Sequence, residues 1–221
     1  MASLISLTFD DGLRCQFEHA LPLLDAHGIP ATFFLIANQE PTHEGHRNEW
    51  WKIEWSESDI AMLGQAVQRG HEIGSHSVTH DWMPTQPEFE ATESKRLIQN
   101  WMKTEVSSFA YPYCRTDLTD AVKKAGYRQA RAGAGNSYYP LGSGLDFNLD
   151  CRQVSDNDDV KDWIRADHWH ILMFHGIGDQ HSGWAPVAIE RFASIVSELA
   201  ELRKSKAVEL VTFKDGVRRF H

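Results

Sequence analysis

Short apolar segments alternate with segments of helical periodicity about seven times along this chain of 221 residues. Residues 31–37 form a near-continuous apolar run, which is typical of a strand covered on both faces. Residues 15–27, just before it, carry apolar side chains at roughly helical spacing and stop at Gly28. Strand and helix in this repeated order imply a parallel sheet with right-handed connections. The chain is therefore expected to be an α/β protein.

The same patterns give expected bounds for each element. The glycine-bearing residues 133–144 and 176–184 are expected to be loops, and Pro22 is expected to kink the first helix. We expect strands within 5–12, 31–37, 72–77, 107–111, 127–132, 149–155, 170–174 and 208–213, and helices at 15–27, 56–70, 87–103, 116–125, 158–166 and 186–204.

Candidate site residues follow the first, third, fourth and seventh strands, an arrangement that fits a closed barrel. An open doubly wound sheet is the structural alternative. A length of 221 residues and 42% hydrophobic residues suit one well-packed domain, and no linker divides the chain. We therefore expect a single domain over residues 1–221.

The first strand ends in two adjacent carboxylates, Asp10 and Asp11, followed by Gly12. Neighbouring residues of a strand point to opposite faces, so the two carboxylates could serve one centre only where the chain bends, and Gly12 permits a bend. Two carboxylates this close repel each other unless a cation or a proton intervenes. An ordinary Asp-Asp-Gly turn is the structural alternative.

A histidine pair with metal-ligand spacing follows the third strand. His76 and His80 are four residues apart, and on a helical turn this spacing places both rings on one face. With one carboxylate they would form a His-His-Asp set whose fourth position is open to water, as in hydrolytic zinc sites. Cobalt, nickel and iron also accept mixed nitrogen and oxygen ligands. A surface pair of histidines is the alternative.

Four short motifs, in their order along the chain, carry a family resemblance. They are TFDDG at 8–12, HSVTH at 76–80, FAYPYC at 109–114 and LMFHG at 172–176. From about Leu4 onward the sequence resembles the polysaccharide deacetylase family, carbohydrate esterase family 4, also known as the NodB-homology domain. The resemblance implies a distorted (β/α) barrel with about seven parallel strands.

The resemblance also implies a metal centre. Asp11, His76 and His80 match the metal ligands of the family, and Asp10 matches its catalytic base. The implied cofactor is one divalent metal ion, zinc in the first place, with cobalt and nickel as alternatives. Such an ion would acidify a water molecule, so that a neighbouring carboxylate need remove only a loosened proton.

Three further residues match the family by position. His175 matches the general acid, and a histidine suits this role because its ordinary pKa lies near working pH. The backbone N–H of Tyr113 matches a donor to the oxyanion. Asp162, which a tryptophan follows, matches the carboxylate that orients the acid histidine.

One position departs from the family pattern. Many members begin the third motif with an arginine that pairs with the base, and here that position is Ala110. Without this arginine the base loses a partner that would lower its pKa. Arg152 and Arg131, on neighbouring predicted strands, and Arg14 are the candidate replacements.

Several tryptophans fall where a substrate could touch them. Trp184 follows the acid histidine closely enough to line a groove, and Trp82 could line its other side. Residues 38–55 form a polar segment with three tryptophans, which is expected to be either a wall on which sugars stack or a lid that packs by its indoles.

The leading functional prediction is a metal-dependent hydrolase that removes acetyl groups from N-acetylated amino sugars in a poly- or oligosaccharide. An O-acetyl esterase on a plant polysaccharide such as xylan is the first alternative. A catalytically inactive carbohydrate-binding protein of the same fold is the second.

The predicted partner is an acetylated carbohydrate. A net charge of −9 argues against a nucleic acid or an anionic membrane surface, since both need basic patches. The first residues carry no signal-peptide pattern, so the chain as written is expected to be cytoplasmic, and secreted if such a peptide has been trimmed.

Overall fold

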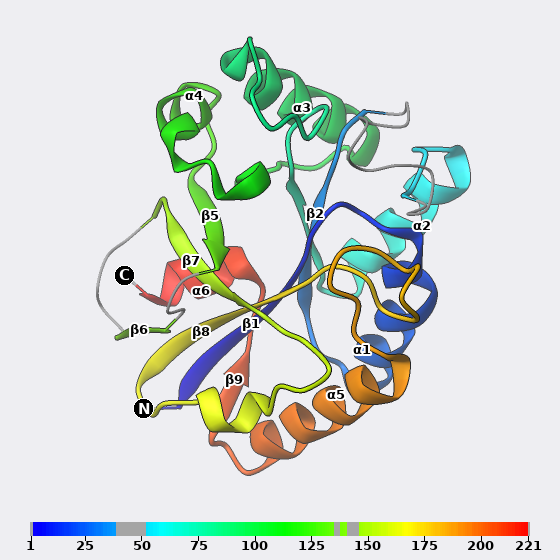
Figure 1. Cartoon of the computed structure of the whole chain (residues 1–221), viewed down its shortest axis with the longest axis vertical. Helices are drawn as coiled ribbons and strands as arrows, with labels where there is room; N and C mark the ends of the chain where they lie inside the picture. The colour runs from blue at the N-terminus through cyan, green and yellow to red at the C-terminus, as the bar shows by residue number, and fades with distance from the viewer. Residues whose placement is uncertain (1, 39–51, 135–137, 141–145, 221) are drawn as a thin grey trace.

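The structure is a computed structural model that describes residues 2–38, 52–134, 138–140 and 146–220. Within these residues seven parallel strands form a closed barrel in the order β1, β2, β3, β4, β5, β7, β8, and β8 pairs back to β1 (Figure 1). Their bounds are Ser3–Phe9, Ala31–Leu35, Glu72–Ser75, Ser108–Ala110, Gln129–Ala134, Leu149–Gln153 and His168–Phe174. The predicted distorted (β/α) barrel is therefore confirmed, and the open sheet is excluded.

Two short strands extend the sheet beyond the barrel. β9 (Val208–Leu210) lies parallel to β1, and β6 (Tyr138–Pro140) lies antiparallel to β8. The prediction of a loop over 133–144 was wrong in part, because β5 continues through Ala134 and β6 follows. Tyr138 explains β6, since its ring packs against two histidine rings of β8 and aromatic residues favour strands.

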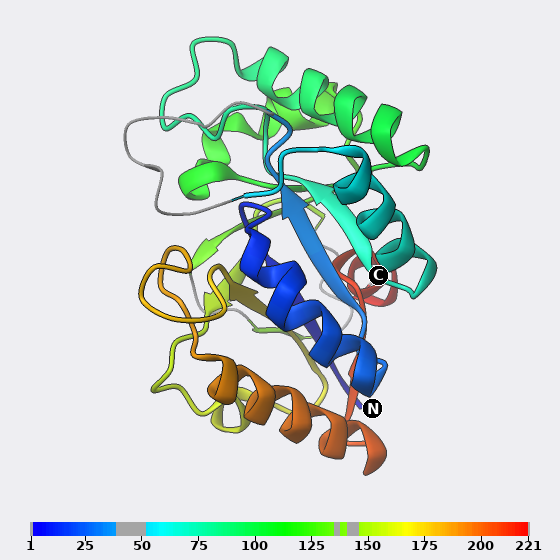
Figure 2. The same cartoon turned by 90° about the vertical axis from the view of Figure 1, so that its right-hand side faces the viewer.

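Within the described residues, five α-helices lie on the outside of the barrel strands (Figures 1 and 2). They are α1 (Leu21–His27), α2 (Glu57–Gln68), α3 (Pro87–Met102), α4 (Thr119–Lys124) and α5 (Ile189–Lys204). Phe9, Phe33 and Phe174 stack in the apolar layer beneath them, and Phe192 of α5 contacts two of these rings edge-on. This layer fixes the strands that carry the candidate site.

The first and fifth predicted helices differ in detail from the structure. The segment 15–27 divides into a π-helical turn, η1 (Gln16–Ala20), and α1, and Pro22 lies in the first turn of α1, directly after the π-helical turn. The predicted helix at 158–166 is only a 3-10 turn, η4 (Val160–Trp163). Two more 3-10 turns, η2 (Pro112–Cys114) and η3 (Thr116–Leu118), precede α4.

The predictions near the end of the chain also need correction. α5 begins at Ile189, so Pro186 lies before the helix. The strand expected over 208–213 stops at Leu210, and α6 (Phe213–Phe220) was missed. Its signal was present in the sequence, because Thr212 caps the helix by accepting the N–H of Asp215 at 3.3 Å.

α6 packs against the inside of the barrel. Phe213 and Val217 share a buried cluster with Phe34 of β2 and with Trp169 and Ile171 of β8, and this cluster contains no residue of α1 to α5. It is therefore the interior of the barrel, which α6 helps to fill.

A buried carboxyl group ties α6 to three strands. Glu72 of β3 accepts hydrogen bonds from Thr32 Oγ1 at 2.8 Å, from the backbone N–H of Lys214 at 2.9 Å and from the hydroxyl of Ser108. Burial raises the pKa of Glu72. These bonds satisfy a group that would otherwise be costly to bury.

Among the helices of the described residues, none has both the length and the apolar character needed to cross a bilayer.

Candidate active site

A cavity of about 640 Å³ opens at the carboxyl ends of β1, β3, β4 and β8. Side chains at this end of a parallel barrel come from separate strands and meet in space. The cavity is lined by Asp10, Asp11, His76, His80, Tyr111, Tyr113, Cys114, Arg131, Ala132, Gln153, Met173, His175 and Trp184.

The chain bends sharply at the two adjacent carboxylates. Asp11 has φ 72° and Gly12 has φ 68°, both in the left-handed region. The predicted bend is thus confirmed, and it brings Asp10 and Asp11, both buried, to the same cavity.

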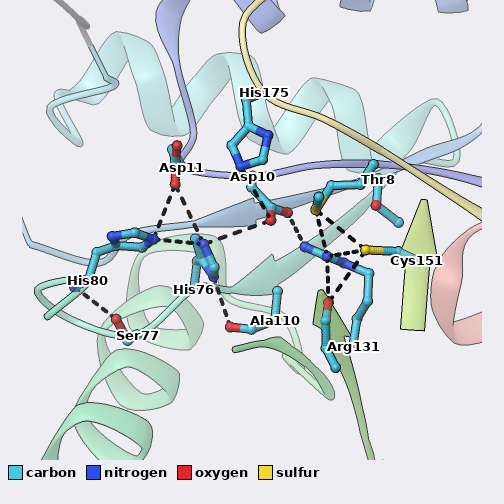
Figure 3. A network of polar contacts seen from close by, with 12 residues as sticks. Thr8, Asp10, Asp11, His76, Ser77, His80, Ala110, Arg131, Cys151 and His175 are labelled. Atoms are coloured by element: carbon cyan, nitrogen blue, oxygen red, sulfur yellow. Dashed lines mark hydrogen bonds and ion pairs between the residues drawn. The ribbon is translucent and has the colours of Figure 1, made fainter. Parts of the chain in front are cut away.

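Asp11, His76 and His80 converge on one point (Figure 3). Asp11 Oδ1 lies 3.5 Å from Nε2 of each histidine, and the two Nε2 atoms are 3.1 Å apart. Donor atoms that bind one ion tetrahedrally at about 2.0–2.1 Å lie about 3.3 Å from each other. Asp11 Oδ1 is buried and has no hydrogen-bond partner among the described residues. The three side chains therefore fit a common divalent cation.

The ring of His76 is oriented by the main chain of β4. Its Nδ1–H donates to the carbonyl oxygen of Ala110 at 2.8 Å, which leaves the lone pair of Nε2 directed at the cluster. Burial lowers the pKa of His76 to about 4. The ring is neutral at physiological pH, the form that binds a metal.

The turn that carries the histidine pair is irregular, so the prediction of a helical turn was wrong. Ser77 and His80 have φ of 66° and 57°, and His80 donates its N–H to Ser77 Oγ at 2.9 Å. Glu90 of α3 accepts the N–H groups of Val78 and Thr79, each at 2.9 Å. A carboxylate from a neighbouring helix thus fixes the turn, and the sequence offered no pairing signal for it.

The base candidate Asp10 has an arginine partner despite Ala110. Arg131 of β5, 1% exposed, binds Asp10 Oδ1 through Nη2 (Figure 3). Although burial opposes ionisation, the charges of Arg131, His76 and His175 hold the pKa of Asp10 below its usual value. Of the three arginines considered from the sequence, Arg131 is the one that reaches the carboxylate.

The other two arginines have different partners. Arg14 binds Asp59 at 2.6 Å, beside the N-terminus of α2. Arg152 is exposed and lies with its guanidinium 3.5 Å from the centre of the Trp163 ring. Arg152 therefore does not replace the missing arginine, because its side chain lies outside the cavity that contains Asp10.

Asp162 also lies outside the cavity, in a separate small pocket that it shares with Arg152. His175 Nδ1 has no hydrogen-bond partner among the described residues, so Asp162 does not orient this ring. Asp162 sits in the short turn η4 and is exposed, so the structure does not bring it to the predicted position beside the acid histidine. His175 itself follows β8, with Nε2 4.0 Å from Asp10 Oδ2.

Aromatic side chains stand at the rim of the cavity. The ring of Tyr113 lies 4.6 Å from His80 and 4.9 Å from Trp82, and Tyr113 has a left-handed φ of 51°. Trp184, also a lining residue, is 59% exposed and Trp82 is 55% exposed. These indoles are available to a ligand.

One tryptophan of the segment 38–55 packs into the protein. Trp55 is buried, stacks on Trp101 at 4.3 Å and donates its indole N–H to the carbonyl oxygen of Ile36. The interpretation as a packing residue is correct for Trp55. Trp50 and Trp51 lie outside the described residues.

Fold and site together define the class: a seven-stranded (β/α) barrel with an Asp-His-His cluster at the carboxyl ends of its strands. Residues 2–130 match the family model for polysaccharide deacetylases. The chain belongs to the polysaccharide deacetylase family.

Named relatives agree with this membership. The putative polysaccharide deacetylase YxkH of Bacillus subtilis (strain 168) is 28% identical over 130 residues, which cover 56% of this chain and 42% of YxkH. The chitin deacetylase of Colletotrichum lindemuthianum is 23% identical over 222 residues, which cover 95% of this chain and 77% of that enzyme. The match to YxkH spans less than half of its length.

Solved structures share the fold. The family 4 acetyl xylan esterase from Clostridium thermocellum, in complex with a cobalt ion, superposes with a TM-score of 0.61 at 20% identity. The superposition covers 97% of this chain and 90% of the esterase. At this identity the likeness establishes the barrel and nothing more.

Proposed function

We propose that this chain is a metal-dependent hydrolase that removes acetyl groups from N-acetylated amino sugars in an oligo- or polysaccharide. The observation that carries the proposal is the convergence of Asp11, His76 and His80 in a cavity that also contains Asp10 and His175. Family membership supports a deacetylase, and so do the relatives that bear that name.

The proposed cofactor is one divalent cation, with zinc in the first place. Two imidazole nitrogens and one carboxylate oxygen are ligands of the kind that zinc binds in proteins, and cobalt and nickel bind them too. The cobalt ion of the Clostridium thermocellum esterase supports cobalt as an alternative. A bound cation would polarise the acetyl carbonyl and lower the pKa of a water molecule.

In the proposed reaction the protein supplies the proton transfers. Arg131 holds Asp10 Oδ1, and the other oxygen, Oδ2, faces His76 and His175 at 3.9 and 4.0 Å. Oδ2 is thus placed to take a proton from the attacking water. His175 Nε2 then donates a proton to the departing amine nitrogen, while the backbone N–H of Tyr113 is the proposed donor to the oxyanion.

The proposed substrate is a neutral or cationic glycan. Trp184 and the pair Trp82 and Tyr113 offer aromatic faces at the rim, and such faces can stack on sugar rings. A net charge of −9 disfavours a strongly anionic polymer. Trp184 and Tyr113 line the cavity itself, so they would contact the sugar that carries the acetyl group.

Acetate release tests the proposal. The wild type and Asp10→Asn are assayed on chito-oligosaccharides and on acetylated xylan, with the metal content of both measured. We expect the wild type to release acetate faster from chito-oligosaccharides, and Asp10→Asn to lose most of this activity while keeping its metal. Faster release from xylan would instead favour an O-acetyl esterase, for which the acetyl xylan esterase among the solved structures is the supporting observation. Equal rates for wild type and variant would refute the enzymatic role.

A further inference from the structure

We infer that Gln16 is a positioning residue that sets the spacing between Asp10 and His175. This inference rests on the proposed function, because it assigns Gln16 to the same reaction. Gln16 is fully buried, and it lies four residues after Gly12, which ends the turn formed by the two carboxylates. Its side chain does not line the cavity, so it would act through the two residues that do.

The side-chain amide of Gln16 joins the two strands that carry the base and the acid. Nε2 donates to the carbonyl oxygen of Asp10 at 2.6 Å and to the carbonyl oxygen of His175 at 2.9 Å. A primary amide has two N–H donors, and both are used here. The opposite orientation would place an oxygen against two carbonyl oxygens, so the assignment of nitrogen follows from the chemistry.

These two carbonyl groups lie where the pairing of β1 with β8 ends. The last pair in register is Phe9 with Phe174, and Asp10 donates its N–H to Phe174 at 3.0 Å. Beyond this bond the chains part, one into the bend at Asp11 and the other toward Gly176. The amide of Gln16 replaces the next rung of the ladder, and both residues joined by this rung are the proposed proton carriers.

The local backbone supports a dedicated role. Gln16 opens the π-helical turn η1, and π-helical turns are rare and frequent at functional sites. Cys15, its neighbour, donates its thiol to the carbonyl oxygen of Ser182 at 3.1 Å and accepts the N–H of Ile177 at 3.4 Å. The start of η1 therefore braces the segment that leaves His175.

One atom of the side chain has no structural use. Gln16 Oε1 is buried and has no hydrogen-bond partner among the described residues. A buried amide with an unsatisfied oxygen is a poor choice for stability alone. Its presence is explained if the two donated bonds serve the geometry of the site.

The experiment compares Gln16→Met with Gln129→Met in the metal-loaded full chain. Gln129 is a matched control, because it is also buried and its side-chain amide donates to the hydroxyls of Ser107 and Ser108. Gln129 begins β5, so it lies at the opposite end of that strand from the cavity. Gln16→Asn, which keeps both donors on a shorter side chain, is the second variant in case Gln16→Met folds poorly. The measurements are kcat and KM for acetate release, metal content, and thermal unfolding.

We expect kcat of Gln16→Met to fall by about 10- to 100-fold, because a small misplacement of reacting groups is costly, while KM and metal content change little. Gln129→Met should lose stability and keep its kcat. A kcat of Gln16→Met equal to that of Gln129→Met would overturn the inference, and so would loss of metal in step with loss of activity.

A crystal structure of each variant gives a readout that needs no turnover. The separation of Asp10 Oδ2 from His175 Nε2, 4.0 Å here, should change in Gln16→Met and stay constant in Gln129→Met. An unchanged separation in both variants would overturn the inference. A wild type that releases no acetate would refute the proposed function alone, and the separation would still decide the role of Gln16.

Discussion

The two oxygens of Asp10 have different neighbours, and this division bears on the proposed chemistry. Oδ1 is bound by Arg131, which also donates to the carbonyl oxygen of Ala132 and to the sulfur atoms of Cys151 and Met173. Oδ2 faces two histidines. A carboxylate held in this way keeps one oxygen fixed and presents the other, which suits a base that must be positioned before it acts.

Replacing Arg131 tests this division. Arg131→Met should leave the Asp10 carboxylate buried beside an apolar side chain, and loss of one partner of a buried ion pair costs about 3–5 kcal/mol of stability. We expect kcat to fall at least about 10-fold, with a smaller loss for Arg131→Lys, which keeps the charge. Acetate release and thermal unfolding measure the two effects. Arg152→Met is the control and should match the wild type, because Arg152 stacks on Trp163 outside the cavity.

Replacing His175 separates metal binding from proton donation. His175→Ala removes no member of the Asp11, His76 and His80 cluster, so we expect a full complement of metal. Turnover should fall by about 10² to 10⁴, the usual contribution of general acid catalysis. Metal analysis and kcat together check this outcome, and full activity of the variant would remove His175 from the mechanism.

At the level of single residues, motif spacing predicted the cluster but not its support. Asp10, Asp11, His76, His80 and His175 lie in short stretches whose letters are distinctive. Arg131 stands 121 residues from Asp10, so the sequence named it only as one of three candidate arginines, and the fold of the barrel decides among them. The orienting contacts of Ala110 and Gln16 are made with backbone atoms, which leave no mark in a sequence.

The loop between α2 and β3 contains a histidine whose protonation should affect stability. His71 is buried, accepts the N–H of Ala31 on Nδ1 at 3.1 Å and directs Nε2 at Asp25 Oδ1, 3.2 Å away. Nδ1 can accept only when it carries no proton, so the neutral ring is the one that fits. Burial, as the largest cause, lowers the pKa of His71 below 6.5.

The sign of the pH effect follows. The pKa of His71 is lower in the folded state than in the unfolded state. The unfolded chain therefore binds more protons once the pH falls below about 6.5, and the free energy of unfolding falls with further decrease in pH. We expect the free energy of unfolding of the wild type to decline more between pH 7.5 and pH 5.5 than that of His71→Asn. Denaturant titrations at both pH values measure it. His181→Asn, at an exposed position, should behave as the wild type does, and parallel declines in all three would contradict the prediction.

At the level of elements, long periodic segments were predictable and short ones were not. The helices α2 and α3 follow their apolar spacing, and Ser56 caps α2 with Asp59 in a reciprocal pair. The strand β6 and the helix α6 depend on contacts with the barrel, namely the histidine rings of β8 for Tyr138 and the interior cluster for Phe213. Tertiary packing supports both elements, whereas their local signals, the Thr212 cap of α6 and the aromatic Tyr138 of β6, were too short to predict them alone.

The whole barrel depends on a pairing between distant parts of the chain. β1 pairs with β8 over six residues, from Leu4 with Trp169 to Phe9 with Phe174. Alternating strands and helices predict a parallel sheet, but whether the sheet closes depends on accumulated twist and strand tilt. The prediction that the sheet closes into a barrel therefore came from the family resemblance and not from the periodicity of the sequence.

Metal binding should stabilise the whole molecule, since its ligands come from two strand ends that are joined only in the fold. An ion that binds the folded state alone adds about 2.7 kcal/mol at a hundredfold excess over its Kd. For a chain of this size that corresponds to a rise in Tm of about 5–10 °C. Thermal unfolding of metal-free protein with and without added zinc measures the shift, and His80→Ala should abolish it. An equal rise in the variant would place the ion elsewhere.

The way α6 fills the barrel sets a condition on synthesis in the cell. Phe213 and Val217 enter the interior only after every strand of the barrel has emerged from the ribosome, and Glu72 and Thr32 find their backbone partners at the same late moment. A nascent chain that ends before residue 213 should therefore hold a barrel whose interior is incompletely filled and more open to proteases.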